Sequence, residues 1–253
     1  MTEALKVAAL AVLQGVAEFL PISSSGHLVI GREVMGLSEA GLRLDVFLHV
    51  GTLVAVFAFY RKVVMRMVAM REWAYALKIA LSAVPVGVVG VFLRGRIEDA
   101  FSSPAAVACA LLFTGLVLVA TKWLGRGAKE MTWLKALSTG VAQAVAILPG
   151  VSRSGMTISA ARAMGVSPAR AAEFSFLMSA PPIAGAAILD IVSSGGADAA
   201  VQTPWGLVAF GGVLSAAVGY FSLKVLVRIL DSDRFWLFGP YCIAAALIVF
   251  LVV

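Results

Sequence analysis

Six long apolar runs, separated by short polar segments, dominate the hydrophobic pattern of this chain. Most of them approach the roughly 20 residues that an α-helix needs to cross the hydrocarbon core of a bilayer. None shows the alternation of apolar and polar residues that a membrane β-strand requires. The pattern predicts six transmembrane helices, and we expect the first to extend past residue 60 with its basic side chains reaching back to the interface. The runs cover residues 46–60, 74–93, 104–123, 171–192, 205–227 and 236–253.

Two further apolar stretches, residues 4–28 and 133–164, are interrupted near their middles by Pro and by clusters of Ser and Gly. A Pro removes a backbone donor and a Ser/Gly cluster favours a turn, so neither stretch is expected to form a continuous helix. Irregular backbone at membrane depth is tolerated only where protein buries it or where it lines a wet cavity. We therefore expect two re-entrant helical hairpins inside the helix bundle.

Composition supports a membrane location. Hydrophobic residues make up 61% of the 253 residues and charged residues 13%, and the mean hydropathy is +0.98. A soluble domain carries about 25% charged residues, so this chain lacks the polar surface to face water on all sides. We expect residues 1–253 to form a single all-α polytopic membrane domain.

The net charge of +6 comes from Lys and Arg residues clustered between the apolar runs. Such clusters suit anionic lipid headgroups, so membrane lipids and not nucleic acids are the expected partners. The three main clusters, in residues 61–71, 122–135 and 224–234, fall on one side of the membrane, which the positive-inside rule makes cytoplasmic. Both termini are then predicted to lie outside a cytoplasmic membrane, with the two hairpins entering from opposite sides.

This orientation makes the two halves of the chain, approximately residues 1–125 and 126–253, inverted copies of each other. Each half contains a hairpin, a linker and a helix in the same order. Inverted-topology repeats that meet at the bilayer midplane are a transporter architecture, in which broken helices supply the ligand site. The predicted fold alone therefore does not separate transport from catalysis.

The two interruptions carry related polar motifs. Polar groups in hydrocarbon are costly unless they face a cavity or one another, so the two motifs predict one buried polar site. The first motif is Gln14-x-x-x-Glu18 followed by Pro21 and Ser23-Ser24-Ser25-Gly26-His27. The second is Gly140-Val141-Ala142-Gln143 followed by Leu148-Pro149-Gly150-Val151-Ser152-Arg153-Ser154-Gly155-Met156-Thr157.

In the first motif, Gln14 and Glu18 are four residues apart and share one helix face just before the break. An intramembrane carboxylate is a functional candidate by default, although hydrogen bonds to the Ser/Gly loop would give Glu18 a purely structural role. Ser residues beside Gly often serve only as turn and cap residues. A His within reach of a Ser hydroxyl would supply a base that makes the hydroxyl nucleophilic, so His27 makes this loop a candidate catalytic element.

In the second motif, Arg153 is permanently charged, and its planar fork matches phosphate oxygens, so a buried Arg implies an anionic partner. The surrounding Gly and Ser residues allow backbone N–H groups to converge on an anion. The alternative is an internal salt bridge from Arg153 to Glu18, since charges within a membrane pair with one another. Both interpretations bring the two loops together.

Asp45 and His49 flank the start of the first predicted span. Asp45 is interpreted as a structural helix cap, and the role of His49 is left open. No spacing of His, Cys and carboxylate residues resembles a zinc site, and no Walker loop or dinucleotide fingerprint occurs in the sequence. No organic cofactor is expected.

The motifs resemble those of the undecaprenyl-diphosphatase (bacitracin-resistance) membrane phosphatases. The matching elements are the Gln14-x-x-x-Glu18 pair and residues 19–27, 45–52, 149–157 and 174–177, and the resemblance covers the whole chain. It implies six spans, two re-entrant loops, dephosphorylation of a C55 polyprenyl diphosphate at the outer face, and assistance by Mg²⁺ or Ca²⁺. Gln14 stands where many members have Glu, which leaves Glu18 as the only carboxylate of that pair.

The resulting hypothesis is a phosphatase that converts undecaprenyl diphosphate into the monophosphate carrier reused in cell-envelope synthesis. Ser24 is the predicted nucleophile, Ser23 and Ser25 are the reserve candidates, and His27 is the base and then the acid. Glu18, together with Gln14, would orient His27, position water or hold a divalent cation. Arg153 would stabilise the charge that develops on the transferring phosphoryl group. The other predicted substrate contacts are Gln14, Ser23, Ser25, Gly150, Ser152, Ser154, Gly155 and Thr157.

A transporter is the competing function, because an inverted repeat with a midplane phosphate site could move a polyprenyl phosphate without cleaving it. Three Ser residues beside a His favour hydrolysis, since transport needs no nucleophile. A scaffold protein would gain nothing from a charged site in hydrocarbon. The sequence leaves the metal, the lipid chain length and the oligomeric state open, a homodimer included.

Overall fold

The computed structural model describes residues 2–36, 41–93, 95, 100, 103–193 and 204–252. Over these residues the prediction of an all-α chain is confirmed, with one isolated bridge between Lys129 and Val166. The helices are α1 (Glu3–Ala17), α2 (Ser24–Met35), α3 (Gly41–Phe59), α4 (Arg61–Val68), α5 (Trp73–Phe92), α7 (Pro104–Ala120), α8 (Trp133–Val145), α9 (Arg153–Ala163), α10 (Pro168–Leu177), α11 (Ala180–Ser193), α12 (Trp205–Asp231) and α13 (Phe238–Val252), with short 3-10 turns at Thr121–Trp123 and Phe235–Leu237.

Several helices are long and apolar enough to cross a membrane. Within the described residues, four segments meet this criterion alone, and the bent pair Leu44–Phe59 with Arg61–Val68 makes a fifth if it is counted as one span. The last predicted span, residues 236–253, corresponds to a shorter apolar helix, Phe235–Leu251. The chain is a multi-pass membrane protein, and the count of six spans stays a prediction. The four segments are Trp73–Phe92, Pro104–Trp123, Pro168–Ile188 and Trp205–Asp231.

The first predicted span ends differently from the expectation. The axes of the segments on either side of Tyr60 are bent by 82°, so α3 does not continue past that residue as one straight helix, and only the bent pair counted together extends the span. The cause lies in α4, which buries Val63 and exposes Lys62 and Arg66. A helix with one apolar face and one basic face is better placed along an interface than across hydrocarbon. The straight part of the span gains length at its other end, because α3 begins at Gly41.

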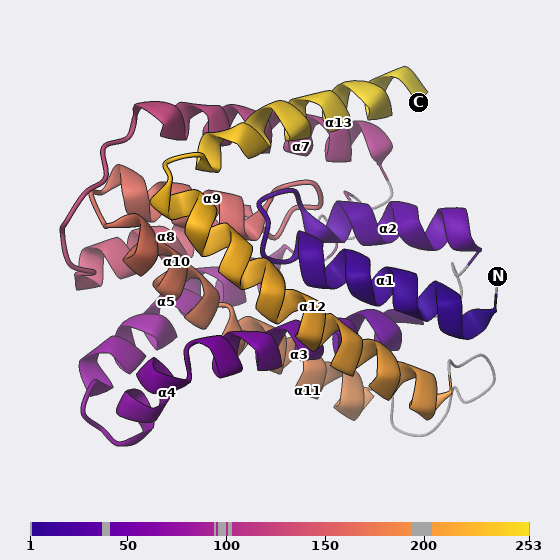
Figure 1. The fold of residues 1–253 in the computed structure, drawn as a ribbon, viewed down its shortest axis with the longest axis horizontal. Helices are drawn as coiled ribbons and strands as arrows, with labels where there is room; N and C mark the ends of the chain where they lie inside the picture. The colour runs from indigo at the N-terminus through magenta and orange to yellow at the C-terminus, as the bar shows by residue number, and fades with distance from the viewer. Residues whose placement is uncertain are drawn as a thin grey trace.

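The two predicted interruptions are confirmed. α1 ends at Ala17 and α2 begins at Ser24, while α8 ends at Val145 and α9 begins at Arg153. Each pair of helices is in contact, which makes two helical hairpins whose loops lie near the middle of the molecule (Figure 1). The second arm of the first hairpin continues to Met35, beyond the predicted end at residue 28.

Helices from opposite halves of the chain pack against each other. α1 contacts α12, α8 contacts α5, α3 contacts α12 and α11, and α7 runs along α13 (Figure 1). Glycine permits the closest of these approaches: a Cβ atom on Gly51 of α3 would lie 2.2 Å from the carbonyl oxygen of Gly212 in α12. This packing encloses the loops of both hairpins between helices of both halves.

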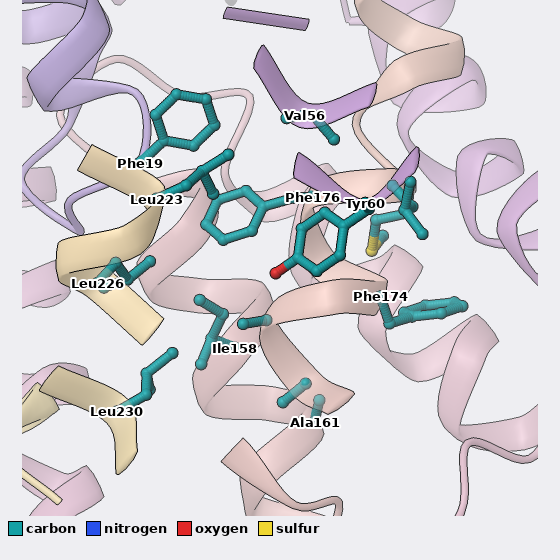
Figure 2. Packing of buried hydrophobic residues seen from close by; sticks show 14 of the residues in the cluster. Phe19, Val56, Tyr60, Ile158, Ala161, Phe174, Phe176, Leu223, Leu226 and Leu230 are labelled. Atoms are coloured by element: carbon teal, nitrogen blue, oxygen red, sulfur yellow. The ribbon is translucent and has the colours of Figure 1, made fainter. Parts of the chain in front are cut away.

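The main apolar core anchors the first hairpin loop. Phe19, immediately after Glu18, packs edge-on against Phe176 of α10 with ring centroids 5.3 Å apart. The cluster continues through Ile158 of α9 and Leu223 of α12, all of them buried (Figure 2). Because Phe19 is fixed in this core, the neighbouring Glu18 has a defined position.

Candidate active site

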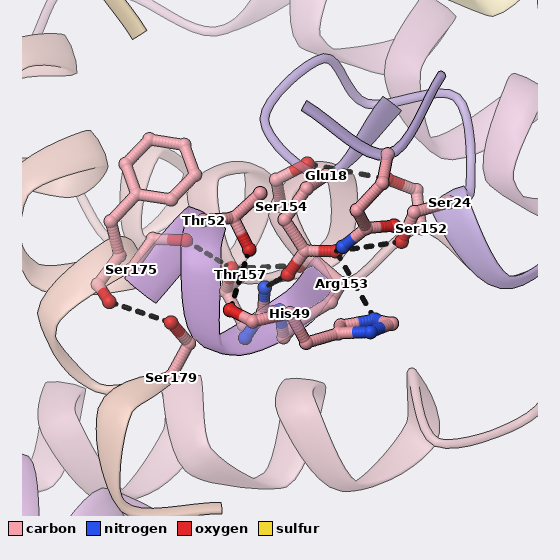
Figure 3. Close-up of polar contacts among 12 residues, drawn as sticks. Glu18, Ser24, His49, Thr52, Ser152, Arg153, Ser154, Thr157, Ser175 and Ser179 are labelled. Atoms are coloured by element: carbon pink, nitrogen blue, oxygen red, sulfur yellow. Dashed lines mark hydrogen bonds and ion pairs between the residues drawn. The ribbon is translucent and has the colours of Figure 1, made fainter. Parts of the chain in front are cut away.

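The two hairpin loops meet at Glu18, whose side chain is only 5% exposed. Gln14 Nε2 donates to Glu18 Oε2 at 3.1 Å, and Ser24 Oγ donates to the same oxygen at 2.7 Å. From the second loop, Arg153 Nη2 donates to Glu18 Oε1 (Figure 3). The expectation that the two motifs form one buried polar site is confirmed, and the ion pair considered as an alternative for Arg153 is present.

The turn of the first loop directs Ser24 toward this carboxylate. Ser23 is 2% exposed and has φ of +69°, a left-handed conformation that is uncommon for residues other than glycine. Its carbonyl accepts from the backbone N–H of His27 at 3.3 Å, and the His27 ring atom Nδ1 lies 2.8 Å from the same oxygen. The chain therefore reverses at Ser23, and Ser24 becomes the first residue of α2.

The second loop is braced by Thr114 of α7. Thr114 Oγ1 donates to the Gly150 carbonyl at 3.1 Å and accepts from the Ser152 N–H at 3.1 Å. Gly150 has φ of +91°, and a Cβ atom there would lie 2.5 Å from the Val107 carbonyl oxygen, so only glycine fits. Ser152 caps α9 by accepting from the Gly155 N–H at 3.1 Å. These contacts place Arg153 in the first turn of α9, facing Glu18.

His49 belongs to this site, although the sequence indicated no role for it. Its Nε2 lies 3.7 Å from Glu18 Oε2, and its Nδ1 lies 2.8 Å from the carbonyl oxygen of Asp45, one turn earlier in α3. A carbonyl can only accept, so Nδ1 carries a proton and Nε2 is the atom that faces Glu18. The available signal was an ionisable residue within the apolar run 46–60.

The structure gives Ser24 a different partner from the predicted one. The Ser24 hydroxyl donates to Glu18, while both ring nitrogens of His27 are engaged elsewhere, Nδ1 with the Ser23 carbonyl and Nε2 with the Tyr241 hydroxyl at 2.7 Å. The bond to Ser23 and the stacking on Tyr241 turn the imidazole toward α13. The proton acceptor within reach of Ser24 is thus a carboxylate.

The other predicted substrate contacts separate into two groups. Ser25 and Arg153 line a cavity beside the two loops. Ser152, Ser154 and Thr157 are at most 2% exposed, and their hydroxyls bond within the protein. Ser152 Oγ lies 3.4 Å from Ser154 Oγ, and Thr157 Oγ1 donates to the Arg153 carbonyl at 2.8 Å. These three side chains hold the second loop in shape.

Close packing of the two loops accounts for another predicted position. A Cβ atom on Gly155 would lie 3.1 Å from Ser152 Oγ and 3.3 Å from Pro21 Cβ, so Gly155 lets the first loop approach the second. Ser23 is buried in the first loop with its Oγ 3.4 Å from Ser25 Oγ. Gly155 and Ser23 therefore contribute to loop geometry.

The cavity beside the loops has a volume of about 630 Å³, which lies within the usual range for ligand pockets. Arg32, Asp45 and His49 line it together with Arg153, and its other walls are mainly apolar. Arg32 Nη1 lies 2.9 Å from Asp45 Oδ2. Asp45 lies inside α3, which begins at Gly41, so its interpretation as a helix cap was wrong. A cavity with charged and apolar walls suits a ligand with a charged head and an apolar tail.

The side-chain oxygen atoms of Glu18 and Gln14 are the candidate ligands for a divalent cation at this site. No group of three or more His, Cys, Asp or Glu side chains suitable for a metal occurs within the described part of the chain. Gln14 Oε1 is buried beside Glu18 and has no hydrogen-bond partner there. Mg²⁺ is commonly held by one or two carboxylates together with substrate phosphates. Glu18 and Gln14 therefore fit a cation that a diphosphate helps to hold.

Comparison with known proteins identifies the family. The family model described as "Bacitracin resistance protein BacA" matches residues 7–248. The chain belongs to the BacA family. A protein named undecaprenyl-diphosphatase from Desulfatibacillum aliphaticivorans is 38% identical over 94% of each chain. A protein of the same name from Halothermothrix orenii is 38% identical over 95% of this chain and 94% of its own. Another from Rubrobacter xylanophilus is 36% identical over 98% of each chain. The BacA match includes both hairpin loops, which confirms the family resemblance seen in the motifs.

Proposed function

We propose that this BacA protein hydrolyses undecaprenyl diphosphate to the monophosphate and inorganic phosphate. The observation that carries the proposal is the contact of Glu18 with Ser24 and Arg153, because it combines a nucleophile, a proton acceptor and a phosphate-binding cation. The adjoining cavity has room for a charged headgroup and apolar walls for the start of the lipid chain. The names of the similar proteins support the same substrate.

The reaction begins with binding of the terminal phosphate at Arg153. Its guanidinium uses Nη2 for Glu18, and its remaining N–H groups can donate to phosphate oxygens. Ser24 Oγ then attacks the terminal phosphorus while its proton passes to Glu18 Oε2, the oxygen to which it already donates at 2.7 Å. The bond between phosphorus and the bridging oxygen breaks, and the lipid monophosphate leaves. Glu18 passes the Ser24 proton to the bridging oxygen of the leaving monophosphate and is again a carboxylate. Water then attacks the phosphorus on Ser24 while Glu18 accepts the water proton; the bond between phosphorus and Ser24 Oγ breaks, Glu18 returns the proton to Ser24 Oγ, and inorganic phosphate leaves.

His49 and His27 have supporting roles in this mechanism. His49 Nε2 lies 3.7 Å from the Glu18 oxygen that accepts the proton, so the imidazole can respond through space to charge changes at the carboxylate. His27 holds the Ser23 carbonyl and thereby the turn that presents Ser24. A divalent cation held by Glu18, Gln14 Oε1 and the diphosphate would neutralise negative charge on the phosphates.

The membrane arrangement is part of the proposal. The contact of α1 with α12 and the corresponding contact of α8 with α5 support an inverted repeat, because each hairpin packs on a helix of the other half. The basic clusters support a cytoplasmic membrane with both termini outside and the site open to the outer face.

Phosphate release from undecaprenyl diphosphate by the purified protein in detergent tests the function. Ser24→Ala and Glu18→Gln should each lower the rate by about 10²–10⁴-fold, and the double variant should be little worse, because the two residues act as one unit. Ser232→Ala, at the far end of α12 where the hydroxyl bonds to Ile229, is the matched control and should be as active as the wild type. A wild-type protein that releases no phosphate yet moves the lipid across vesicles would be a transporter.

A further inference from the structure

Gln143 is a buried polar side chain of the cavity that the mechanism above does not use. It lies in α8, is 2% exposed and lines the cavity together with Arg153 and His49. Neither its Oε1 nor its Nε2 has a hydrogen-bond partner among the described residues. Almost all buried polar groups in proteins are hydrogen-bonded, and a primary amide can donate twice and accept twice. Both amide atoms are buried and lack protein partners, while the residue lines the cavity, so the contents of the cavity are the partners that remain for a small movement of this side chain.

The position of Gln143 matches that of Glu18 in the first hairpin. Gly15-Val16-Ala17-Glu18 and Gly140-Val141-Ala142-Gln143 share three residues and differ only at the last. Both glycines make close helix contacts, since a Cβ atom on Gly15 would lie 2.8 Å from Val218 of α12 and one on Gly140 would lie 2.4 Å from the Ser82 carbonyl of α5. The second hairpin thus presents a neutral amide where the first presents a carboxylate.

The neutral amide suits an anionic ligand. A second carboxylate on the cavity wall would repel phosphate oxygens, whereas an amide N–H donates to them without adding negative charge. The cavity already brings the cation Arg153 to the same space. The Gln143 amide would add an uncharged hydrogen-bond donor to the charged donor Arg153 around a phosphate headgroup.

We propose that Gln143 binds the headgroup of the lipid diphosphate, with Nε2 donating to a phosphate oxygen and Oε1 accepting from bound water or a protonated phosphate oxygen. The proposal rests on the proposed function and adds a substrate-binding residue to it. Gln143 makes no contact with Ser24 or Glu18 that would assign it to the proton transfer, so it contributes to affinity.

Gln143→Leu in the purified full-length protein tests the proposal, because leucine keeps the approximate volume and removes the amide. We expect KM for undecaprenyl diphosphate to rise roughly tenfold to a hundredfold, as for a lost hydrogen bond to a charged group, with a smaller change in kcat. The thermal unfolding midpoint without ligand should stay equal or rise, because an unpaired buried amide is replaced by an apolar group. Gln143→Glu should raise KM further, because it adds a negative charge.

Thr139→Val, one turn earlier in α8, is the matched control. Thr139 is buried and its hydroxyl donates to the Lys135 carbonyl, so this variant should keep the wild-type KM. The proposal is overturned if Gln143→Leu keeps the wild-type KM, or if it lowers the unfolding midpoint without changing KM. The rise in unfolding midpoint caused by undecaprenyl diphosphate gives a second readout that needs no hydrolysis. If undecaprenyl diphosphate raises the unfolding midpoint of the wild type but no phosphate is released, only the proposed function is contradicted. If the lipid raises the unfolding midpoint of Gln143→Leu as much as that of the wild type, the role of Gln143 is contradicted.

Discussion

At the scale of single residues, the site depends on how one carboxylate is kept charged inside a membrane protein. A buried ion pair is tolerated only when further hydrogen bonds satisfy the remaining atoms of both partners. Arg153 supplies the contact to one oxygen of Glu18, and Gln14 and Ser24 supply contacts to the other. A phosphate that enters the site must share Arg153 with Glu18. The shape of the guanidinium, and not only its charge, therefore matters for binding.

Replacing Arg153 with Lys should remove most of the turnover although the charge is retained. An ammonium group is a point charge and cannot contact Glu18 and two phosphate oxygens through a planar fork. We expect a loss of at least about 100-fold in kcat/KM, as for removal of a donor that stabilises a transition state. The measurement is steady-state phosphate release. Near wild-type activity of Arg153→Lys would show that Arg153 is only a structural partner of Glu18.

Substitutions of His27 separate a positioning role from acid–base catalysis. An Asn side chain can donate to the Ser23 carbonyl, as His27 Nδ1 does, but it cannot carry a titrating proton. We expect His27→Asn to keep several-fold more activity than His27→Ala, with the pH profile of the wild type. If both variants are equally inactive, the acid–base role first predicted for His27 is favoured.

The site residues that the sequence predicted are those that interrupt its apolar runs. Glu18 and Arg153 lie beside Pro and Ser/Gly clusters in apolar sequence, so their proximity followed from the cost of polar groups in hydrocarbon. His49 lies within an apolar helix and Gln143 ends the first part of the second motif, but their places at the cavity depend on how α3 and α8 pack. A hydrogen bond from the Ser/Gly loop to Glu18 was one of the alternatives that the sequence offered, but the left-handed turn at Ser23 decides that Ser24 makes it, and no sequence pattern indicates that turn.

At the scale of helices and loops, the second loop owes its shape to a helix from the other half of the chain. Thr114 of α7 bonds to two backbone groups of this loop, the Gly150 carbonyl and the Ser152 N–H. Local sequence predicted that the loop would form, since Pro149 and Gly150 interrupt an apolar run. The partner that holds the loop is 36 residues away from Gly150, and no sequence pattern indicates that contact.

Replacing Thr114 with Val tests this brace. Valine keeps the shape of threonine but leaves two buried backbone groups unpaired, which costs about 1–3 kcal/mol for each unsatisfied group. We expect a lower unfolding midpoint in detergent and a reduced rate of phosphate release, because Arg153 directly follows the loosened segment. Thr121→Val is the control, since the Thr121 hydroxyl bonds only to the Leu118 carbonyl of its own helix turn. Equal effects of the two substitutions would contradict a special role for Thr114.

The bend at Tyr60 shows why the end of one straight helix could not be predicted. The apolar run up to Tyr60 continues into Val63 and Val64, so hydrophobicity alone favours a longer span. Basic residues such as Arg61 and Lys62 next to the apolar Val63 fit a longer span whose basic side chains reach back to the interface. They fit a separate amphipathic helix equally well. The choice between the two depends on the surroundings of α4, which only the structure supplies.

At the scale of the whole molecule, the site exists only where the two halves of the chain meet. Each half contributes one loop, and α7 of the first half braces the loop of the second. The sequence predicted the all-α membrane fold and the two interrupted apolar stretches correctly, because membrane helices follow from composition and length. Which end of the molecule faces the cytoplasm remains a prediction from the positions of the basic clusters.

Labelling of introduced cysteines tests that direction. In a Cys109→Ala background, which removes an exposed native thiol, Gly196→Cys should react with a membrane-impermeant maleimide in intact cells. Gly125→Cys, beside Arg126 in a basic segment, should react only after the cells are made permeable. Gly196 lies outside the residues that the structure describes, so its side of the membrane is inferred from charge alone. The reverse labelling pattern would mean that the orientation and the access side of the substrate are wrong.

The ion pair between Arg153 and Glu18 has a consequence for biosynthesis. The two residues are 135 positions apart, so at roughly 5–20 residues per second the ribosome makes Arg153 about 7–27 s after Glu18. During that interval Glu18 has the Gln14 amide and the Ser24 hydroxyl of its own hairpin but lacks the guanidinium, and a carboxylate without a counter-charge is costly in hydrocarbon. We therefore expect the first hairpin to stay hydrated, or to carry a protonated Glu18, until the second hairpin arrives. Completion of the site is, on this timescale, a late event of biosynthesis.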